Sequence, residues 1–181
     1  MKLVIFADGA SAGNPGPAGL AYVVTAVPCG MSIDQIRPED LVQASKPADV
    51  KPGGLWKLHS EARRLVMECG NGRAEAAAAT SGLVRACRYA AMLPDISKVE
   101  LISDAQYVVG AINGWLDGWA NSGWRTSKKT DVANRDVWEW YLANTTPEFR
   151  AMARALYRSE THPMIAECDR GASQAAGSRN K

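Results

Sequence analysis

Apolar and polar positions along the chain alternate between short runs of strand length and longer stretches with a helical period. Apolar, partly β-branched runs occur at 3–8, 20–27 and 98–104 and predict buried strands. An alanine-rich stretch from 74 to 93, stopped by Pro94, has the 3.6-residue period of a helix. This order of elements predicts an α/β fold.

Weaker patterns complete the predicted sheet. Residues 65–69 read as a third strand, and three strands without a long intervening helix favour an antiparallel meander. The strand at 98–104 passes into a helical segment at 105–112, and a strand–helix–strand crossover makes it parallel to its neighbour. Residues 151–157 are read as the last strand, although their alanines also suit a helix, and 164–176 as the last helix.

Residues 28–58 break the pattern, because prolines and glycines recur there without apolar periodicity. One short helix over 38–44 is the only element expected inside this stretch. A loop of this length is unusual in a compact domain and indicates an insertion. We therefore expect a single domain over 1–176, with an insertion at 28–58 and a frayed tail at 177–181.

Composition narrows the class of protein. The chain has 181 residues, 46% hydrophobic and 22% charged, which suits one globular domain. A net charge of +2 is too small to argue for a polyanionic partner by itself. Four cysteines far apart, without a metal-binding spacing, favour reduced thiols and a cytoplasmic location. No apolar run approaches the roughly 18 residues of a membrane span, so no membrane is expected as a partner.

Two aspartates close apolar strands. Asp8 ends the first run and precedes a turn rich in Gly, Asn and Pro; Asp104 ends the run at 98–104 in the same way. Asp8 can be a simple turn or cap residue, or it can bind a cation. If the two strands are parallel neighbours, both carboxylates finish close together and repel unless a divalent cation neutralises them.

Glu75 stands in the first turn of the alanine-rich helix. It shares one face with Ala79, Leu83 and Ala86, which is the face expected to meet the core. A glutamate that only complements the helix dipole more naturally lies on the wet face. A functional role and a dipole role are both left open.

A segment rich in tryptophan and cations follows. Trp115, Trp119 and Trp138 are read mainly as residues that pack short helices onto the sheet. The stretch 123–129 differs, because it combines a turn glycine, an aromatic residue and three cations without an acid. This composition predicts a protrusion that faces phosphates.

The order of these signals resembles the type 1 ribonuclease H family. The resemblance covers nearly the whole chain apart from 28–58 and the tail. The motifs that carry it are Asp8-Gly9, Gly13-Asn14-Pro15-Gly16-Pro17, Asn71-Gly72-Arg73-Ala74-Glu75, Ser103-Asp104-Ala105-Gln106-Tyr107-Val108, Gly114-Trp115, Gly123-Trp124-Arg125-Thr126, Lys128-Lys129 and Cys168-Asp169. No single motif is specific to this family, but the occurrence of all of them in this order is.

The resemblance implies a five-stranded mixed sheet of order 3-2-1-4-5 flanked by helices. It also implies that Asp8, Glu75, Asp104 and Asp169 hold two Mg²⁺ ions, with Mn²⁺ as a substitute. The implied activity is sequence-independent endonucleolytic hydrolysis of the RNA strand of RNA–DNA hybrids, leaving 5′-phosphomonoesters. A monomer is expected.

The resemblance also implies a substrate-binding set. Asn14, Asn71 and Gln106 would contact the nucleic-acid backbone near the minor groove, and Glu75 could accept a hydrogen bond from a 2′-hydroxyl. The protrusion would grip the DNA strand. The remaining members of the set are Trp115, Trp119, Trp124, Arg125, Thr126, Lys128 and Lys129.

Two departures from the family pattern stand out. Before the last helix, Ser159 or Glu160 occupies the place of an expected histidine, so Glu160 or His162 is a candidate to replace it; His162 can equally be an ordinary surface loop residue. Gly70 and Gly72 flank Asn71 where side chains for phosphate contacts are usual. Two alternatives remain: a catalytically weak hybrid-binding protein, and a DNA nuclease or integrase-like enzyme on the same fold.

Overall fold

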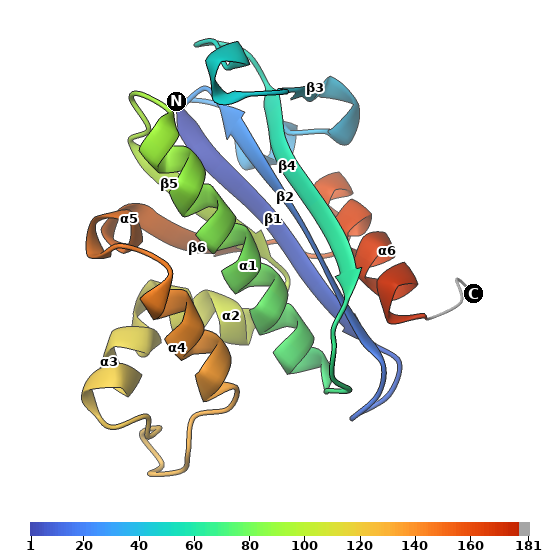
Figure 1. The fold of residues 1–181 in the computed structure, drawn as a ribbon, viewed down its shortest axis with the longest axis vertical. Helices are drawn as coiled ribbons and strands as arrows, with labels where there is room; N and C mark the ends of the chain where they lie inside the picture. The colour runs from blue at the N-terminus through green and yellow to red at the C-terminus, as the bar shows by residue number, and fades with distance from the viewer. Residues whose placement is uncertain (178–181) are drawn as a thin grey trace.

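The computed structural model describes residues 1–177 and shows one mixed sheet flanked by helices (Figure 1). The sheet order is β3-β4-β2-β1-β5-β6. Its strands are β1 (Lys2–Ser11), β2 (Ala18–Val27), β3 (Val42–Gln43), β4 (Trp56–Arg64), β5 (Lys98–Ser103) and β6 (Ala153–Tyr157). Without the two-residue β3, this is the predicted order 3-2-1-4-5, so the predicted fold is confirmed.

Strand directions follow from the connections. β1 pairs antiparallel with β2 through a short turn, and β2 pairs antiparallel with β4 although the insertion lies between them. β1 pairs parallel with β5, and β5 with β6, through helical crossovers. The prediction that the strand at 98–104 runs parallel to the first strand is confirmed.

The helices cover both faces of the sheet. They are α1 (Asn71–Met92), α2 (Gln106–Gly110), α3 (Leu116–Asn121), α4 (Arg135–Ala143), α5 (Pro147–Met152) and α6 (Pro163–Ala176), with a π-turn at Ala111–Trp115 between α2 and α3. Leu3 and Ile5 of β1 pack in the core on the α1 side, whereas Val4 and Phe6 pack with α6. Figure 1 shows α1 in front of the sheet and α6 behind it.

The third long strand lies elsewhere than predicted. Residues 65–69 were expected to form it, but the strand is Trp56–Arg64, and only Cys69 keeps a bridge, to Gly16. The strand is hard to find because most of its side chains are polar and at least partly exposed, so its apolar signal is weak. The expected boundary of the insertion at 58 is therefore wrong, since 56–58 belong to β4.

The insertion contains more structure than predicted. It holds three 3₁₀ turns at Ile33–Gln35, Pro38–Asp40 and Pro47–Asp49, and β3 pairs with β4 at the sheet edge. The helix expected over 38–44 is only the turn at Pro38–Asp40, because Leu41 is already extended. Ile33 and Ile36 are buried in the α6-side core, so this end of the insertion is anchored.

Helix α6 is the last element of the described chain. Helix α6 ends at Gly177, whose φ of 80° is the left-handed conformation typical of a helix-terminating glycine. The rest of the predicted tail, 178–181, lies outside the described residues. Over 1–177, no helix is long and apolar enough to cross a membrane.

Candidate active site

Asp8 and Asp104 stand at matching positions on the two central parallel strands. The last paired residues of β1 and β5 are Phe6 and Ile102, and each aspartate comes two residues later. β1 continues to Ser11 while β5 stops at Ser103, so β1 has no β5 neighbour beside Asp8. The Asp8 side chain is 7% exposed, which places a buried carboxylate at this end of the sheet.

Glu75 is brought to the same place by a close helix–strand contact. A Cβ atom on Gly9 would lie 2.1 Å from the backbone carbon of Ala74 and 2.3 Å from the nitrogen of Glu75. Only glycine permits this approach, because any larger residue would overlap the helix backbone. The first turn of α1 therefore lies directly against β1, one residue beyond Asp8.

Asp169 comes from the opposite face of the sheet, on α6. A Cβ on Gly19 would lie 2.2 Å from the carbonyl oxygen of Ala172, so α6 packs tightly onto β2. Next to Asp169, the Cys168 thiol is buried and donates a 3.5 Å hydrogen bond to the carbonyl oxygen of Phe6. These contacts fix Asp169 beside the carboxyl-terminal half of β1.

The four acids are near enough to influence one another electrostatically. Burial and, after it, the charges of Asp104, Asp169 and Glu75 together raise the pKa of Asp8 to about 7, against a 2.8 Å hydrogen bond from the Gly9 amide that lowers it. Burial and the charge of Asp104 also raise the pKa of Glu75. Burial, then the charges of Glu160 and Asp169, raise the pKa of Asp104.

These acids lack the partners that buried acids usually have. Within 1–177, none of the four forms a salt bridge, and the buried Oδ1 of Asp104 has no hydrogen-bond partner. Buried polar atoms normally have a hydrogen-bond partner, so a buried oxygen without one indicates a place where a ligand binds. An all-carboxylate set with no nearby cation fits a hard divalent ion.

The side chains are not already closed around an ion. In the described part of the chain, no three Asp, Glu, His or Cys side chains form a group that could hold a metal as they stand. What fits magnesium is the chemistry of the donor set, because carboxylate oxygens are the ligands that this ion prefers.

The predicted backbone-contact residues lie around this group. Asn71 donates a 2.6 Å hydrogen bond from Nδ2 to Oε1 of Glu75, so it orients that carboxylate. Gly70 leaves space for Asn14, since a Cβ there would lie 2.2 Å from the Asn14 Oδ1. Gln106 is exposed in the first turn of α2, two residues after Asp104. Gly70 therefore has a packing reason, although the family usually has a larger side chain there.

The tryptophans divide differently from the prediction. Trp138 is fully buried and donates a 2.7 Å hydrogen bond to the Tyr107 hydroxyl, as expected for a packing residue. Trp115 was also expected to pack; it lies against Gly110, where a Cβ would be 2.4 Å from its ring, and tilts against Trp119, but it remains 51% exposed. Trp124 was expected on the protrusion surface, yet it is 8% exposed, with the Arg135 guanidinium 5.6 Å from its ring centre. Its indole anchors the protrusion and is not presented for stacking on bases.

The protrusion is a tight loop closed by its own hydrogen bonds. The Thr126 amide donates to the Thr130 carbonyl at 2.9 Å, and Arg125 forms a 3.3 Å ion pair with Asp131. The expectation of three unpaired cations is therefore wrong for Arg125, because the acid just beyond the segment folds back onto it. Lys128 and Lys129 are exposed, and among the described residues neither forms a salt bridge.

Comparison with known proteins identifies the family. The sequence model described as RNase H matches residues 1–176. The chain belongs to the RNase H family. Curated relatives named Ribonuclease H include one from Syntrophotalea carbinolica, 34% identical over 76% of this chain and 67% of that protein, and one from Solibacter usitatus, 28% identical over 99% and 98%.

Solved RNase H structures share the fold. LC11-RNase H1 in complex with RNA/DNA hybrid aligns with a TM-score of 0.61 at 18% identity, over 97% of each chain. The PFV RNase H domain aligns with a TM-score of 0.66 at 17% identity, over 97% of this chain and 94% of that one. At these identities the likeness shows the fold of the RNase H family.

The loop that departs from the RNase H pattern is ordered by His162. The ring is buried, stacks on Phe6 at 5.3 Å, and accepts a 3.3 Å hydrogen bond at Nδ1 from the Met164 amide. Nε2 must then carry the proton and donates to the Ile33 carbonyl at 3.1 Å. His162 is therefore no ordinary surface loop residue, and both its nitrogens are engaged. Glu160 is exposed.

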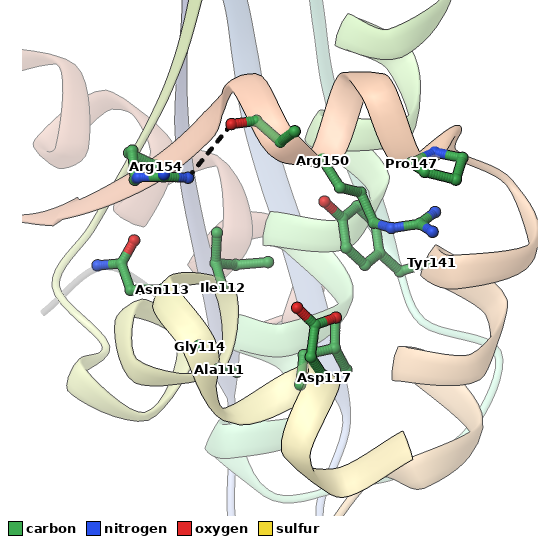
Figure 2. Close-up of a pocket in the computed structure, with 11 residues that line it drawn as sticks. Ala111, Ile112, Asn113, Gly114, Asp117, Tyr141, Pro147, Arg150 and Arg154 are labelled. Carbon is green, nitrogen blue, oxygen red and sulfur yellow. Dashed lines mark hydrogen bonds between the residues drawn. The ribbon is translucent and has the colours of Figure 1, made fainter. Parts of the chain in front are cut away.

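A separate cavity of about 500 Å³ lies away from these acids, between the π-turn, α4 and the start of β6 (Figure 2). Its arginines serve the fold: Arg150 donates 2.6 Å to the Thr145 carbonyl, and Arg154 donates 2.7 Å to the Ala153 carbonyl. None of the four acids lines it. The cavity is not part of the candidate site.

Two residues of the site escaped sequence reasoning. Gly9 was read only as part of a motif, and its close contact with α1 appears only in three dimensions. Arg73 forms a bidentate ion pair with Asp136, with Nη1 to Oδ1 at 2.8 Å, which ties α1 to α4. A cation two positions before a core-facing glutamate gave no signal for a partner 63 residues away.

Proposed function

We propose that this protein hydrolyses the RNA strand of RNA–DNA hybrids as an endonuclease that uses two Mg²⁺ ions. The observation that carries the proposal is the pair Asp8 and Asp104, buried or half-buried on adjacent parallel strands and without a cationic partner among residues 1–177. Membership of the RNase H family supports it, as does the hybrid bound by the similarly folded LC11-RNase H1.

The proposed mechanism assigns each acid a task. Asp8 and Asp104 would hold both ions, with Glu75 and Asp169 as further ligands directly or through water. When bound, a pair of divalent ions supplies an activated water and stabilises the leaving oxygen of the phosphodiester. Asn71 keeps the Glu75 carboxylate turned toward the site, where it could accept from a 2′-hydroxyl. This contact would select RNA over DNA, and 5′-phosphomonoesters would result.

Substrate contacts are proposed to be sequence-independent. Asn71 hydrogen-bonds to Glu75, Asn14 lies against Gly70, and Gln106 follows Asp104 by two residues. Lys128 and Lys129 are exposed on the protrusion. Amides and lysines of this kind read sugar and phosphate, which carry almost no base information. We further propose that residues 1–176 act as one domain and that the protein is a monomer. We also propose a cytoplasmic location, which the four free cysteines of the described chain support.

The test is cleavage of a labelled RNA–DNA hybrid with and without Mg²⁺, beside the same sequence as duplex DNA and as single-stranded RNA. The wild type should cut only the hybrid, and Asp8→Asn or Asp104→Asn should lower the rate by at least about 100-fold. Asp117→Asn, an exposed aspartate outside the site, is the matched control.

Other outcomes have definite meanings. Hybrid binding without cleavage in Mg²⁺ or Mn²⁺ would indicate a binding protein instead. Equal cleavage of DNA strands would indicate a DNA nuclease or integrase-like enzyme. Full activity in both site variants would show that the acids are wrongly assigned.

A further inference from the structure

The insertion contacts the loop that carries Glu160 at both ends of that loop. At one end, Arg158 donates from Nε to Oδ1 of Asp34 at 2.8 Å and from Nη2 to Oδ2 at 3.4 Å. At the other, His162 donates to the carbonyl oxygen of Ile33 at 3.1 Å. Two adjacent insertion residues thus hold the two ends of the segment 158–162.

The insertion side of this contact is itself fixed. Ile33 is 5% exposed and Ile36 fully buried, and both pack in the core that includes Met164 and Ile165 of α6. A segment with buried apolar anchors opens less readily than a surface loop. The 3₁₀ turn at Ile33–Gln35 therefore gives the loop a rigid support.

The loop has few other attachments between its ends. Ser159 and Thr161 share a 2.7 Å hydrogen bond between their hydroxyls, and the Glu160 side chain is exposed. A cavity of about 220 Å³ remains between the loop and the insertion, lined by Asp34, Arg37 and Arg158 among others. The two surfaces thus meet at the two contacts rather than over a filled interface.

The position of this loop matters because it starts beside the acids. The Arg158 amide donates a 3.1 Å hydrogen bond to the carbonyl oxygen of Ser103, the residue before Asp104. Glu160 is close enough for its charge to act on Asp104. Movement of the segment 158–162 would therefore change the effect of the Glu160 charge on Asp104.

We propose that the insertion braces the segment 158–162, with Asp34 and Arg158 as positioning residues that hold the loop carrying Glu160 against the end of β5. The proposal rests on the proposed function only for its effect on turnover. The brace itself is a property of the folded chain and can be measured without substrate.

Hydrogen exchange followed by mass spectrometry tests the brace. In Asp34→Ala, amide exchange over 159–162 should be about two- to fivefold faster, because an exposed ion pair shifts a local opening equilibrium by that factor. Asp34→Glu keeps a carboxylate and should restore slow exchange. Asp40→Ala, at an exposed aspartate of the same insertion with no ion pair among the described residues, should change nothing there.

Kinetics give the second readout. In Asp34→Ala, kcat on the hybrid should fall while KM stays within about twofold, because the segment contains none of the proposed substrate-binding residues and Glu160 acts on Asp104. Asp34→Glu should restore kcat. Unchanged exchange over 159–162, or equal exchange in Asp34→Ala and Asp34→Glu, would overturn the brace. If the wild type cleaves no hybrid, the proposed function fails while the exchange result still decides the brace.

Discussion

At the residue scale, Asp8 shows what separates a structural acid from a site acid. Its carboxylate is buried, its main hydrogen bond comes from the adjacent Gly9 amide, and three other acids raise its pKa. A turn or cap role would leave it solvated or satisfied. The sequence could predict the type and order of the acids, but burial and the missing partner needed coordinates.

The first prediction concerns the pH dependence of stability without metal. Because the pKa of Asp8 rises from 3.8 to about 7, the protonated form is favoured in the folded chain. Its stabilising contribution is complete below pH 3.8 and is lost as the pH rises through about 7. The rise corresponds to at most about 4 kcal/mol. Thermal unfolding in a chelator at about pH 5 and about pH 8 measures it.

Asp8→Asn provides the comparison. This variant should lose most of the fall in Tm between the two pH values and should gain little from added Mg²⁺, whereas the wild type should be stabilised by Mg²⁺ most at the higher pH. Asp117→Asn should behave as the wild type. An Asp8→Asn variant with the wild-type pH profile would contradict the burial of a charged group here.

The second prediction concerns Gly9. In Gly9→Ala the new Cβ would lie 2.1 Å from the Ala74 carbonyl carbon, so α1 must move away from β1 at Glu75. We expect a loss of about 1–3 kcal/mol in the free energy of unfolding together with weaker Mg²⁺ binding. Denaturant unfolding and magnesium titration measure the two effects.

Gly72→Ala is the matched control for Gly9→Ala. A Cβ at Gly72 meets nothing within 4 Å, and it lies in the first turn of the same helix. Alanine is favoured over glycine in helices, so this change should be neutral or slightly stabilising. Equal losses in both variants would show that helix propensity, not the close contact, sets the effect.

At the element scale, the protrusion is an exposed basic loop as predicted, but two of its residues have other roles than expected. Trp124 is buried, Arg125 is paired with Asp131, and Lys128 and Lys129 are exposed. Local composition indicated an exposed basic loop. It could not show which side of the loop turns inward, since that depends on Arg135 and the packing of α4.

The third prediction follows from the two free lysines of the protrusion. Lys128→Gln with Lys129→Gln should weaken hybrid binding and reduce the salt dependence of log K by about 1–2, since each phosphate contact releases about one counter-ion. Binding titrations at several salt concentrations measure the slope. Lys46→Gln with Lys51→Gln, at exposed positions of the insertion, is the control. An unchanged slope in the protrusion variant would contradict a phosphate-facing role.

Strand β4 and the insertion are the parts of the fold that the hydrophobic pattern predicts least well. β1, β5, α1 and α6 have continuous or periodic apolar runs and were predicted near their observed bounds. β4 lies toward the sheet edge with mostly polar side chains, so its residues resemble a loop. The fully or nearly fully buried anchors of the insertion, Ile33, Ile36 and Ala44, are too irregularly spaced to form a period.

At the scale of the whole molecule, the acids at the two ends of the parallel pair β1 and β5 have different surroundings. At the starting end, Glu100 is buried and paired with Lys2 at 2.7 Å and with the more exposed Lys98 at 2.5 Å. Burial alone would raise the pKa of Glu100, but hydrogen bonds from both lysines keep it below its ordinary value. At the finishing end, Asp8 and Asp104 have no such partner in the described chain. One end is neutralised by lysines, and the other is the end at which we propose that metal ions bind.

The last prediction separates these two ends. Lys2→Met should cost about 3 kcal/mol in the free energy of unfolding, because it removes the buried partner of a buried carboxylate. Lys98→Met removes the half-exposed partner of the same acid and should cost no more than about 1 kcal/mol. In both variants the stabilisation by Mg²⁺ should equal that of the wild type, since the acids near Asp8 are untouched. Asp8→Asn should do the reverse, with the metal effect lost and the metal-free fold kept. A Lys2→Met variant that loses Mg²⁺ binding while still folded would show that the two ends are coupled through β1.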